Sequence, residues 1–267
     1  MKNLSKKTVV VTGAKGLIGN ALVDSLIAND CKVIAIDQLF KTSKTAKDYI
    51  HEKNYDNLMC FGVNILDESK LSEAIVKGQE KFGSINGLVN CAAIDFLPES
   101  EFSSTVEELN INDFQKIMNV NVSGQVLCSK IVGKMMIKTK TKGSIINIGS
   151  IYGKVSPKQD MYNHIKTDEG VYKKPLVYSV SKSALTNMSK YLATYWGNNE
   201  IRVNNIVFGG IFNNQDDIFI KNYSQNVPLG RMANIDESIE PILFLLSDSS
   251  SYITGTDLIV DGGWTAW

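Results

Sequence analysis

Histidine is scarce in this chain, with two copies, His51 and His164, among 267 residues. So few imidazoles exclude a histidine-rich metal site and leave a Ser/His/acid triad with almost no candidates. The four cysteines lie far apart without a Cys-x-x-Cys pair, which is typical of reduced thiols and not of a disulfide framework. We expect no bound metal, and proton transfer must use other groups.

An excess of one charge and a long apolar run are also missing. Acidic and basic residues balance at 28 each, so no global field favours nucleic acid or an anionic membrane. No apolar stretch approaches the roughly 18 residues of a transmembrane helix. Thr12, Gly13 and Lys15 interrupt the first apolar run too early for a signal peptide. We expect a soluble, cytoplasmic protein with neither a nucleic-acid nor a membrane partner.

What the sequence does contain is an alternation of short apolar runs with longer amphipathic segments. Most runs lack period-two alternation, as expected for strands covered on both faces. Strands are predicted at 8–12, 32–37, 58–65, 84–90, 143–148, 201–208 and 257–261. Helices are predicted at 17–28, 68–82, 111–137, 178–196 and 236–246. This order favours an α/β fold in which one parallel sheet is doubly wound, within a single domain over 1–267.

A glycine triplet follows the first predicted strand, in TVVVTGAKGLIG, at Gly13, Gly16 and Gly19. Glycine lets the backbone approach a pyrophosphate, and the helix that follows presents free N–H groups and the positive end of its dipole. A strand before the triplet and a helix after it make the pattern specific. It predicts a dinucleotide-binding loop.

Asp37 ends the second predicted strand, in KVIAID. A carboxylate at this place accepts hydrogen bonds from a ribose 2′-hydroxyl and repels a 2′-phosphate. The residue therefore favours NAD over NADP as the cofactor. Lys41 and Lys44 lie a few residues on and reduce that preference.

The pattern Tyr-x-x-x-Lys occurs three times, at Tyr49/Lys53, Tyr162/Lys166 and Tyr178/Lys182. On one helix face, the ammonium lowers the phenol pKa toward working pH, which makes the tyrosine a general acid/base. Only Tyr178 begins a long predicted helix without Gly or Pro. Tyr178 and Lys182 are therefore the predicted catalytic pair, and Tyr49 is expected at the surface.

Motifs occur in order along the whole chain: TGAKGLIG, NCAA, NVSG, NIGS, YSVSK and ITGTDLIVDGG. Together they resemble the short-chain dehydrogenase/reductase family. The resemblance implies a seven-stranded Rossmann-type domain and a catalytic set of Asn121, Ser150, Tyr178 and Lys182. In that set Tyr178 exchanges a proton with the substrate oxygen while hydride moves to or from nicotinamide. Lys182 lowers the tyrosine pKa, Ser150 donates to the reacting oxygen, and Asn121 anchors a water.

The same resemblance implies a cofactor site from several motifs: Gly13, Lys15, Gly16, Leu17, Ile18, Gly19, Asp37, Asn64, Ile65, Asn90, Ala92, Ala93, Tyr178, Lys182, Gly209, Ile211 and Asn213. The chain departs from the family pattern at four places. Ala93 stands for the usual Gly, Asn64 for Asp, Phe208 for Pro and Asn213 for Thr. The nicotinamide contacts after the sixth strand are therefore left open.

The chain is most similar to oxidoreductases of bacterial loci that make sugars for flagellin modification and nonulosonic acids. The motifs that carry this similarity are SIYG, PLVYSVSK, VPLGRMAN and DGGWTAW. That similarity implies a sugar hydroxyl or ketone, on a phosphorylated or nucleotide-linked hexose. Family analogy also implies a homo-oligomer, a tetramer or dimer, with helices 111–137 and 178–196 at one interface. Two alternatives stay open: an epimerase or dehydratase that uses NAD transiently, whose branch has this glycine spacing, and a noncatalytic NAD-sensing protein.

Residues 151–177 interrupt the strand-helix rhythm between the Ser150 and Tyr178 motifs. Both ends of this polar segment must start beside the reacting carbon, so we expect a substrate lid. Its candidate substrate contacts are Tyr152, Tyr162, His164, Lys154, Lys158 and Lys166, with the lysines meeting an anionic group. A surface or oligomer-contact loop is the alternative.

Overall fold

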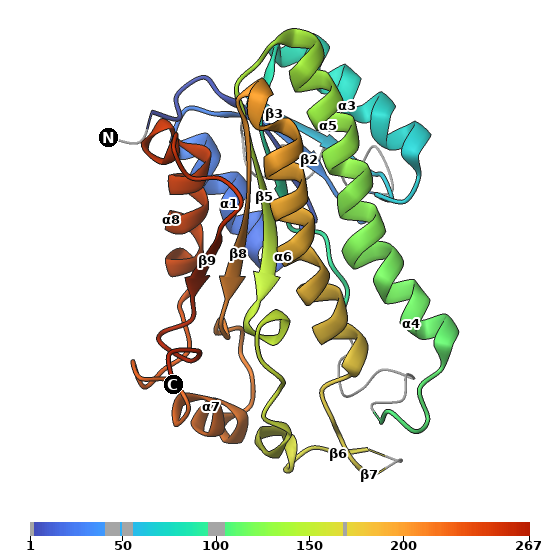
Figure 1. The fold of residues 1–267 in the computed structure, drawn as a ribbon, viewed down its shortest axis with the longest axis vertical. Helices are drawn as coiled ribbons and strands as arrows, with labels where there is room; N and C mark the ends of the chain where they lie inside the picture. Colours follow the sequence, from blue (N-terminus) through green and yellow to red (C-terminus); the bar gives the residue numbers. More distant parts are fainter. Residues whose placement is uncertain (1–2, 41–48, 50–55, 96–104, 168–169) are drawn as a thin grey trace.

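Seven parallel strands form one sheet in the computed structural model, which describes residues 3–40, 49, 56–95, 105–167 and 170–267 (Figure 1). The strand order is β3-β2-β1-β4-β5-β8-β9. The bounds are β1 Thr8–Thr12, β2 Lys32–Ile36, β3 Leu58–Phe61, β4 Ile85–Asn90, β5 Gly143–Ser150, β8 Ile201–Phe208 and β9 Asp257–Val260. The order reverses between β1 and β4, as in doubly wound Rossmann-type sheets, which confirms the predicted fold class.

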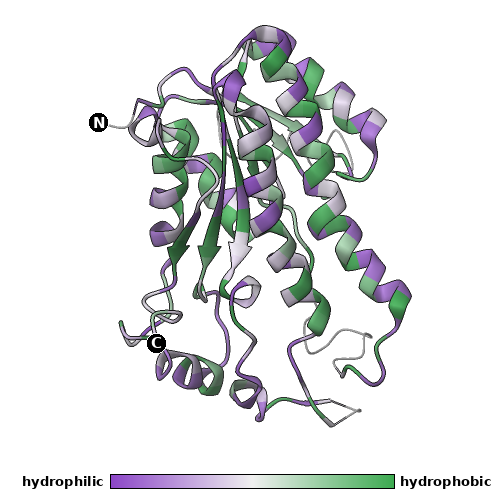
Figure 2. Cartoon of the chain, in the orientation of Figure 1, coloured by the Kyte–Doolittle hydropathy of each residue, from purple (hydrophilic) through white to green (hydrophobic). Residues whose placement is uncertain are grey.

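Helices cover both faces of the sheet. One face carries α1 (Leu17–Ala28) and α8 (Ile235–Leu246), and the other carries α3 (Glu68–Phe82), α5 (Gln125–Thr139) and α6 (Leu176–Trp196). Val9 and Val11 join the core under α1 and α8, whereas Val10 joins the core under α3 and α5. All three side chains are fully buried, and each such burial stabilises the fold by about 1.5–3 kcal/mol. The strands are largely apolar, with buried asparagines in β5 and β8, and polar residues collect on the outer helix faces (Figure 2).

Two predicted elements differ from the structure. The helix expected at 111–137 is α4 (Ile111–Met118) and α5 joined by a π-helical segment, Asn119–Gly124, which contains Asn121. The strand expected at 58–65 ends at Phe61, and the chain then turns toward α3. A π-helical turn inside an α-helix often marks a functional site, and periodicity alone does not reveal it.

The segment between β5 and α6 lies beyond the carboxyl ends of the strands (Figure 1). It contains two short 3-10 helices, Ile151–Gly153 and Gln159–Tyr162, and the strands β6 (Lys166–Thr167) and β7 (Gly170–Val171). It packs on α7 (Asp217–Ser224), with the Tyr162 and Phe219 ring centroids 5.5 Å apart. Asn222 also donates a hydrogen bond of 3.3 Å to the Met161 carbonyl. We call residues 151–167 and 170–175, together with α7, the cap. In the described residues, no helix is long and apolar enough to cross a membrane.

Candidate active site

The glycine loop is packed too tightly for side chains. Gly13 has a φ of +64°, and a Cβ there would lie 2.7 Å from the Ala92 Cα. A Cβ on Gly19 would lie 2.1 Å from the Gly13 carbonyl oxygen. Gly16 is the N-cap of α1 and makes no side-chain cap hydrogen bond. The loop therefore brings main chain and a helix N-terminus to the groove, as pyrophosphate binding requires.

A groove of about 280 Å³ runs from this loop across the ends of the strands. Its lining includes many of the predicted cofactor residues: Gly13, Lys15, Gly16, Asp37, Asn64, Ile65, Ala92 and Ala93. The Asp37 carboxylate is held at one side, accepting from the Lys15 N–H at 3.0 Å and the Leu39 N–H at 2.8 Å. Each oxygen keeps acceptor capacity for a ribose hydroxyl. The residues present therefore fit a dinucleotide.

Other predicted cofactor residues lie outside this lining: Leu17, Ile18, Gly19, Asn90, Gly209, Ile211 and Asn213. Asn90 is fully buried, and its amide donates to Asn147 Oδ1 at 2.8 Å and Ser129 Oγ at 3.2 Å. It joins β4 to its neighbours and does not face the groove. The Ile211 carbonyl accepts from the Gln215 side chain at 3.0 Å.

Residues that sequence reasoning did not assign also line the groove: Ile36, Gln38, Leu39, Val63, Cys91, Ile94 and Val120. Most of them lie at or just after the end of a parallel strand. Their position after predicted strands could have identified them from the sequence, because ligands bind at the carboxyl ends of such strands. Lys41, Lys44 and Lys53 lie outside the described residues.

The catalytic candidates come from three elements that meet at the carboxyl edge of the sheet. Ser150 ends β5, Tyr178 and Lys182 lie in the first two turns of α6, and Asn121 lies in the π-helical segment. The Ser150 side chain lies close enough to Tyr178 to lower the pKa of its phenol. Lys182 is buried, donates to the Ile148 carbonyl at 2.8 Å, and lies 5.7 Å from the centre of the Tyr178 ring. The structure thus brings Ser150, Tyr178 and Lys182 together.

The Asn121 side chain is committed to protein partners. Its amide donates to the Ile94 carbonyl at 2.9 Å and to Ser181 Oγ at 3.2 Å, and its oxygen accepts from the Ile94 N–H at 2.8 Å. Ser181 in turn donates to the Tyr178 carbonyl at 2.8 Å. Asn121 therefore ties the loop after β4 to the first turn of α6 and holds Tyr178 in place.

The pKa of Tyr178 is raised in the structure, and not lowered as expected. Burial raises the pKa of Tyr178, the Asp95 carboxylate raises it further, and the nearby Ser150 side chain lowers it. Burial also lowers the pKa of Lys182 to about 8, against the Asp95 and Cys91 charges that raise it. The physical reason is that the Lys182 ammonium bonds to the Ile148 carbonyl, and the low dielectric disfavours both charged forms.

The other two Tyr-x-x-x-Lys pairs have structural surroundings. Tyr162 lies in a 3-10 helix and Lys166 in β6, so they share no helix face. The Tyr162 hydroxyl bonds to that of Tyr152 at 3.1 Å. Tyr49, expected at the surface, is 6% exposed and donates to Asn20 Oδ1 at 2.8 Å. That expectation is wrong, because the ring packs against Phe40 in the core.

The polar residues predicted to meet substrate mostly fasten the cap. Lys154 forms an ion pair with Asp257 of β9, and Lys158 donates to Asn226 Oδ1 at 2.6 Å. His164 Nε2 lies 2.9 Å from Asp216 Oδ1, and Lys166 is exposed on β6. Of the six candidates, Tyr152 comes nearest the catalytic set. Its ring lies edge-on to Tyr178 with centroids 6.5 Å apart.

Comparison with known proteins gives matches over nearly the whole chain. A family model described as enoyl-(acyl carrier protein) reductase matches residues 13–265. Post-translational flagellin modification protein A of Campylobacter coli is 29% identical over 264 residues, covering 98% of this chain and 99% of that protein. The 2,5-dichloro-2,5-cyclohexadiene-1,4-diol dehydrogenase of Sphingobium indicum is 29% identical over 273 residues, covering 100% of both.

A solved structure agrees with these matches. The crystal structure of a short chain dehydrogenase from Leptospira borgpetersenii serovar Hardjo-bovis with bound NAD+ has a TM-score of 0.82 and 32% identity. The match covers 98% of this chain and 93% of that chain. The chain belongs to the short-chain dehydrogenase/reductase family and is an oxidoreductase.

Proposed function

We propose that this protein is a cytoplasmic, NAD-dependent oxidoreductase that acts on a hydroxyl or ketone of a sugar. The observation that carries this proposal is the meeting of Ser150, Tyr178 and Lys182 at the carboxyl edge of the sheet. The dinucleotide groove lies along the same edge, and its lining residue Cys91 interacts with Lys182. A proton donor/acceptor, a hydrogen-bond donor and a cation in one place are what carbonyl reduction and alcohol oxidation need.

The chain's own groups have distinct tasks in this proposal. When bound, a nicotinamide cofactor supplies or accepts the hydride. Tyr178 gives a proton to, or takes one from, the substrate oxygen, and Ser150 donates a hydrogen bond to that oxygen. Lys182 provides positive charge beside the phenol and a donor for ribose hydroxyls. Asn121 holds the first turn of α6 so that these groups keep their geometry.

NAD is the proposed cofactor because Asp37 is already fixed in the groove by two main-chain N–H groups. A fixed carboxylate can accept from a ribose hydroxyl without reorganising, whereas a 2′-phosphate there would meet like charge. The Leptospira relative, solved with NAD+, supports this choice.

A polar sugar is the proposed substrate, with a phosphorylated or nucleotide-linked hexose as the class. A cavity of about 630 Å³ lies beside the start of α6, and its lining includes Tyr152, Gln159, Lys173, Lys174 and Ser179. The Campylobacter relative is named for flagellin modification, which supports a role in surface-sugar synthesis. In this proposal Tyr152 and Lys154 of the cap line the substrate pocket. The Lys154–Asp257 ion pair and the hydrogen bond from Lys158 to Asn226 anchor the cap.

A screen of phosphosugars and nucleotide sugars, read by the absorbance of reduced nicotinamide, tests the proposal. We expect one sugar class to give net reduced or oxidised cofactor in amounts that match product. Sugar conversion without net cofactor change would instead support the epimerase or dehydratase alternative. NAD binding without conversion of any sugar or cyclic diol would support the noncatalytic alternative.

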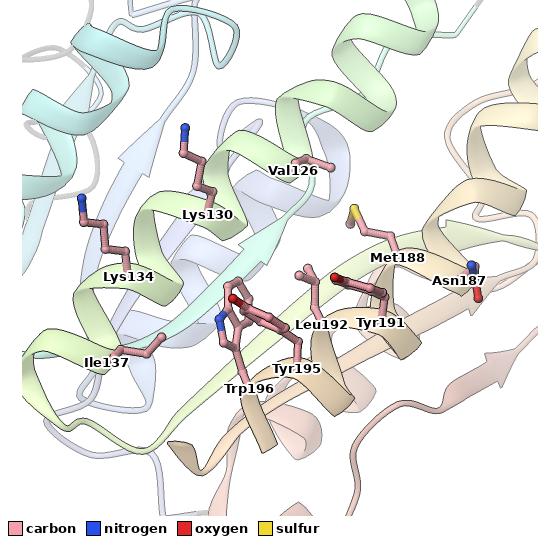
Figure 3. Close-up of a pocket in the computed structure, with 10 residues that line it drawn as sticks. All are labelled: Val126, Lys130, Lys134, Ile137, Asn187, Met188, Tyr191, Leu192, Tyr195 and Trp196. Carbon is pink, nitrogen blue, oxygen red and sulfur yellow. The ribbon is translucent and has the colours of Figure 1, made fainter. Parts of the chain in front are cut away.

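Self-association is the remaining part of the proposal. A groove of about 500 Å³ runs between α5 and α6. Figure 3 shows aromatic and apolar side chains on the α6 side and Lys130 and Lys134 beside Val126 and Ile137 on α5. Tyr191 and Tyr195 are 64% and 67% exposed, and their rings stack with centroids 6.0 Å apart. We propose that a second copy of the chain covers this face. Light scattering should give a multiple of 29.5 kDa, and Tyr195→Asp should lower it.

A further inference from the structure

A second lysine contacts the catalytic tyrosine from outside the Tyr-x-x-x-Lys motif. Lys174, from the cap, places its Nζ 4.5 Å from the centre of the Tyr178 ring. This is closer than the 5.7 Å of Lys182. The same ammonium forms an ion pair with Asp95, which follows β4. The Lys174 side chain is 12% exposed and that of Asp95 is 32% exposed, so the ammonium is largely buried while the carboxylate keeps contact with water.

The main chain of Lys174 is held in place. The Gln159 side-chain oxygen accepts from the Lys174 N–H at 2.8 Å, and the Gln159 amide donates to the Lys174 carbonyl at 3.2 Å. Pro175 follows at once as the N-cap of α6. The β6-β7 hairpin precedes Lys174. At the base of this hairpin the Tyr172 N–H donates a hydrogen bond of 3.0 Å to the Ile165 carbonyl. The backbone of Lys174 is therefore fixed, and it directs the Lys174 side chain toward Tyr178.

The charges around Tyr178 explain why such a cation matters. The groups that face it are Asp95 after β4, Lys182 on α6, Lys174, and the phenols Tyr152 and Tyr162, with Cys91 facing Lys182. Asp95 is the acidic residue among them, and it disfavours the phenolate. Asp95 also acts on Lys182 through space, but the Lys182 ammonium bonds to the Ile148 carbonyl. Lys174 is therefore the cation that forms an ion pair with Asp95.

We propose that Lys174 is a positioning residue of the active site that neutralises Asp95 beside Tyr178 and so favours the phenolate form. This inference rests on the proposed acid/base role of Tyr178. In this inference the cap affects the protonation of Tyr178 in addition to lining the substrate pocket. Removing the ammonium leaves Asp95 unpaired next to the phenol, whereas removing both charges restores the balance.

The proposal can be tested without knowing the substrate. We would incorporate 3,5-difluorotyrosine at position 178, because its phenol is more acidic than that of tyrosine and its fluorine NMR signal reports ionisation at one site. Titration of the full chain, with and without NAD+, should show a higher midpoint in Lys174→Met, by about one pH unit. Asp95→Asn should lower the midpoint, and the double variant should return it close to the parent value.

Two control variants separate charge from folding. Lys174→Arg keeps the charge and should keep the midpoint. Lys173→Met, one position earlier, should also leave it unchanged. Midpoints that do not move in Lys174→Met and Asp95→Asn, or that move equally in Lys173→Met, would overturn the inference. Such a result would leave the acid/base role intact, because that role is tested separately by hydride transfer in Tyr178→Phe.

Discussion

The dinucleotide groove and the catalytic edge lie at the same end of the sheet but are built from different parts of the chain. In the groove, glycines bring main chain against the ligand space, and the Asp37 carboxylate is oriented by N–H groups of Lys15 and Leu39. At the catalytic edge, groups that are far apart in sequence are joined by side-chain hydrogen bonds. Asn121, for example, donates to the loop after β4 and to Ser181. Local main-chain geometry therefore makes the groove, and long-range side-chain contacts make the catalytic edge.

This difference has electrostatic consequences. Asp37 lies on a partly exposed groove wall where water moderates charge. Tyr178 and Lys182 lie in a low dielectric that disfavours both phenolate and ammonium, so their protonation depends on each nearby charge. Substitutions in the two regions should therefore separate binding from chemistry.

Tyr178→Phe should have the largest effect. Losing the hydroxyl removes general acid/base catalysis, which is worth about 10² to 10⁴ in rate, while the NAD dissociation constant stays nearly unchanged. Single-turnover hydride transfer and fluorescence titration of NAD measure the two quantities. Tyr162→Phe is the control and should keep the rate of the chemical step, because the Tyr162 hydroxyl is hydrogen-bonded to that of Tyr152. Full activity in Tyr178→Phe would show that the catalytic edge has been misassigned.

Gly19→Ala should give the opposite separation. Its Cβ would collide with the Gly13 carbonyl oxygen at 2.1 Å, so the loop must shift. Strain of about 1–3 kcal/mol would weaken NAD binding by about 5- to 150-fold, with the Ser150–Tyr178 contact preserved. Calorimetry measures the affinity. Gly197→Ala, where a Cβ meets nothing within 4 Å, is the matched control. Equal losses in both variants would mean general destabilisation.

Asp37→Ala should change cofactor choice and little else. Loss of a charged acceptor costs about 1.5–3 kcal/mol, so NAD affinity should fall about tenfold or more while NADP affinity falls less or rises. The ratio of the two dissociation constants is the measurement. A parent protein that already prefers NADP would contradict the proposed role of Asp37 in the groove.

The smallest expected effect concerns the alkaline stability of the cap. Burial raises the pKa of both Tyr152 and Tyr162 above the unfolded value of about 10. Their stabilising contribution is therefore present below about pH 10 and is lost as pH rises above it. Tyr162→Phe should lower the free energy of unfolding by about 1 kcal/mol at neutral pH. Between pH 9 and 11 this variant should lose less stability than the parent protein.

Urea unfolding at several pH values measures this difference. Tyr252→Phe is the control, because that side chain is fully exposed. An unchanged pH profile in Tyr162→Phe would show that the phenols of the cap do not limit alkaline stability. The cap would then resemble the groove, whose structure depends mainly on main-chain contacts.

The sequence by itself determined the order of strands and helices and the position of the glycine loop, and it predicted Asp37 and Tyr178 as functional residues. Each of these depends on residues close together along the chain: an apolar run, a Gly-x-x-Gly-x-x-Gly spacing, a Tyr and Lys on one helix. Local sterics and periodicity act over the same short range, so the pattern alone carries the information. Even the boundaries of α1 and α3 match the expected ranges.

Only the tertiary structure decided which side chains meet. Lys182 bonds to Ile148, Lys154 to Asp257 of a distant strand, and Lys174 to Asp95. Each pair joins residues whose distance depends on strand order, on the π-helical turn and on the path of the cap. A lysine pattern looks the same whether its ammonium meets substrate or a carboxylate of the same chain. The three-dimensional packing sets that choice, because charge acts through space and burial decides its strength.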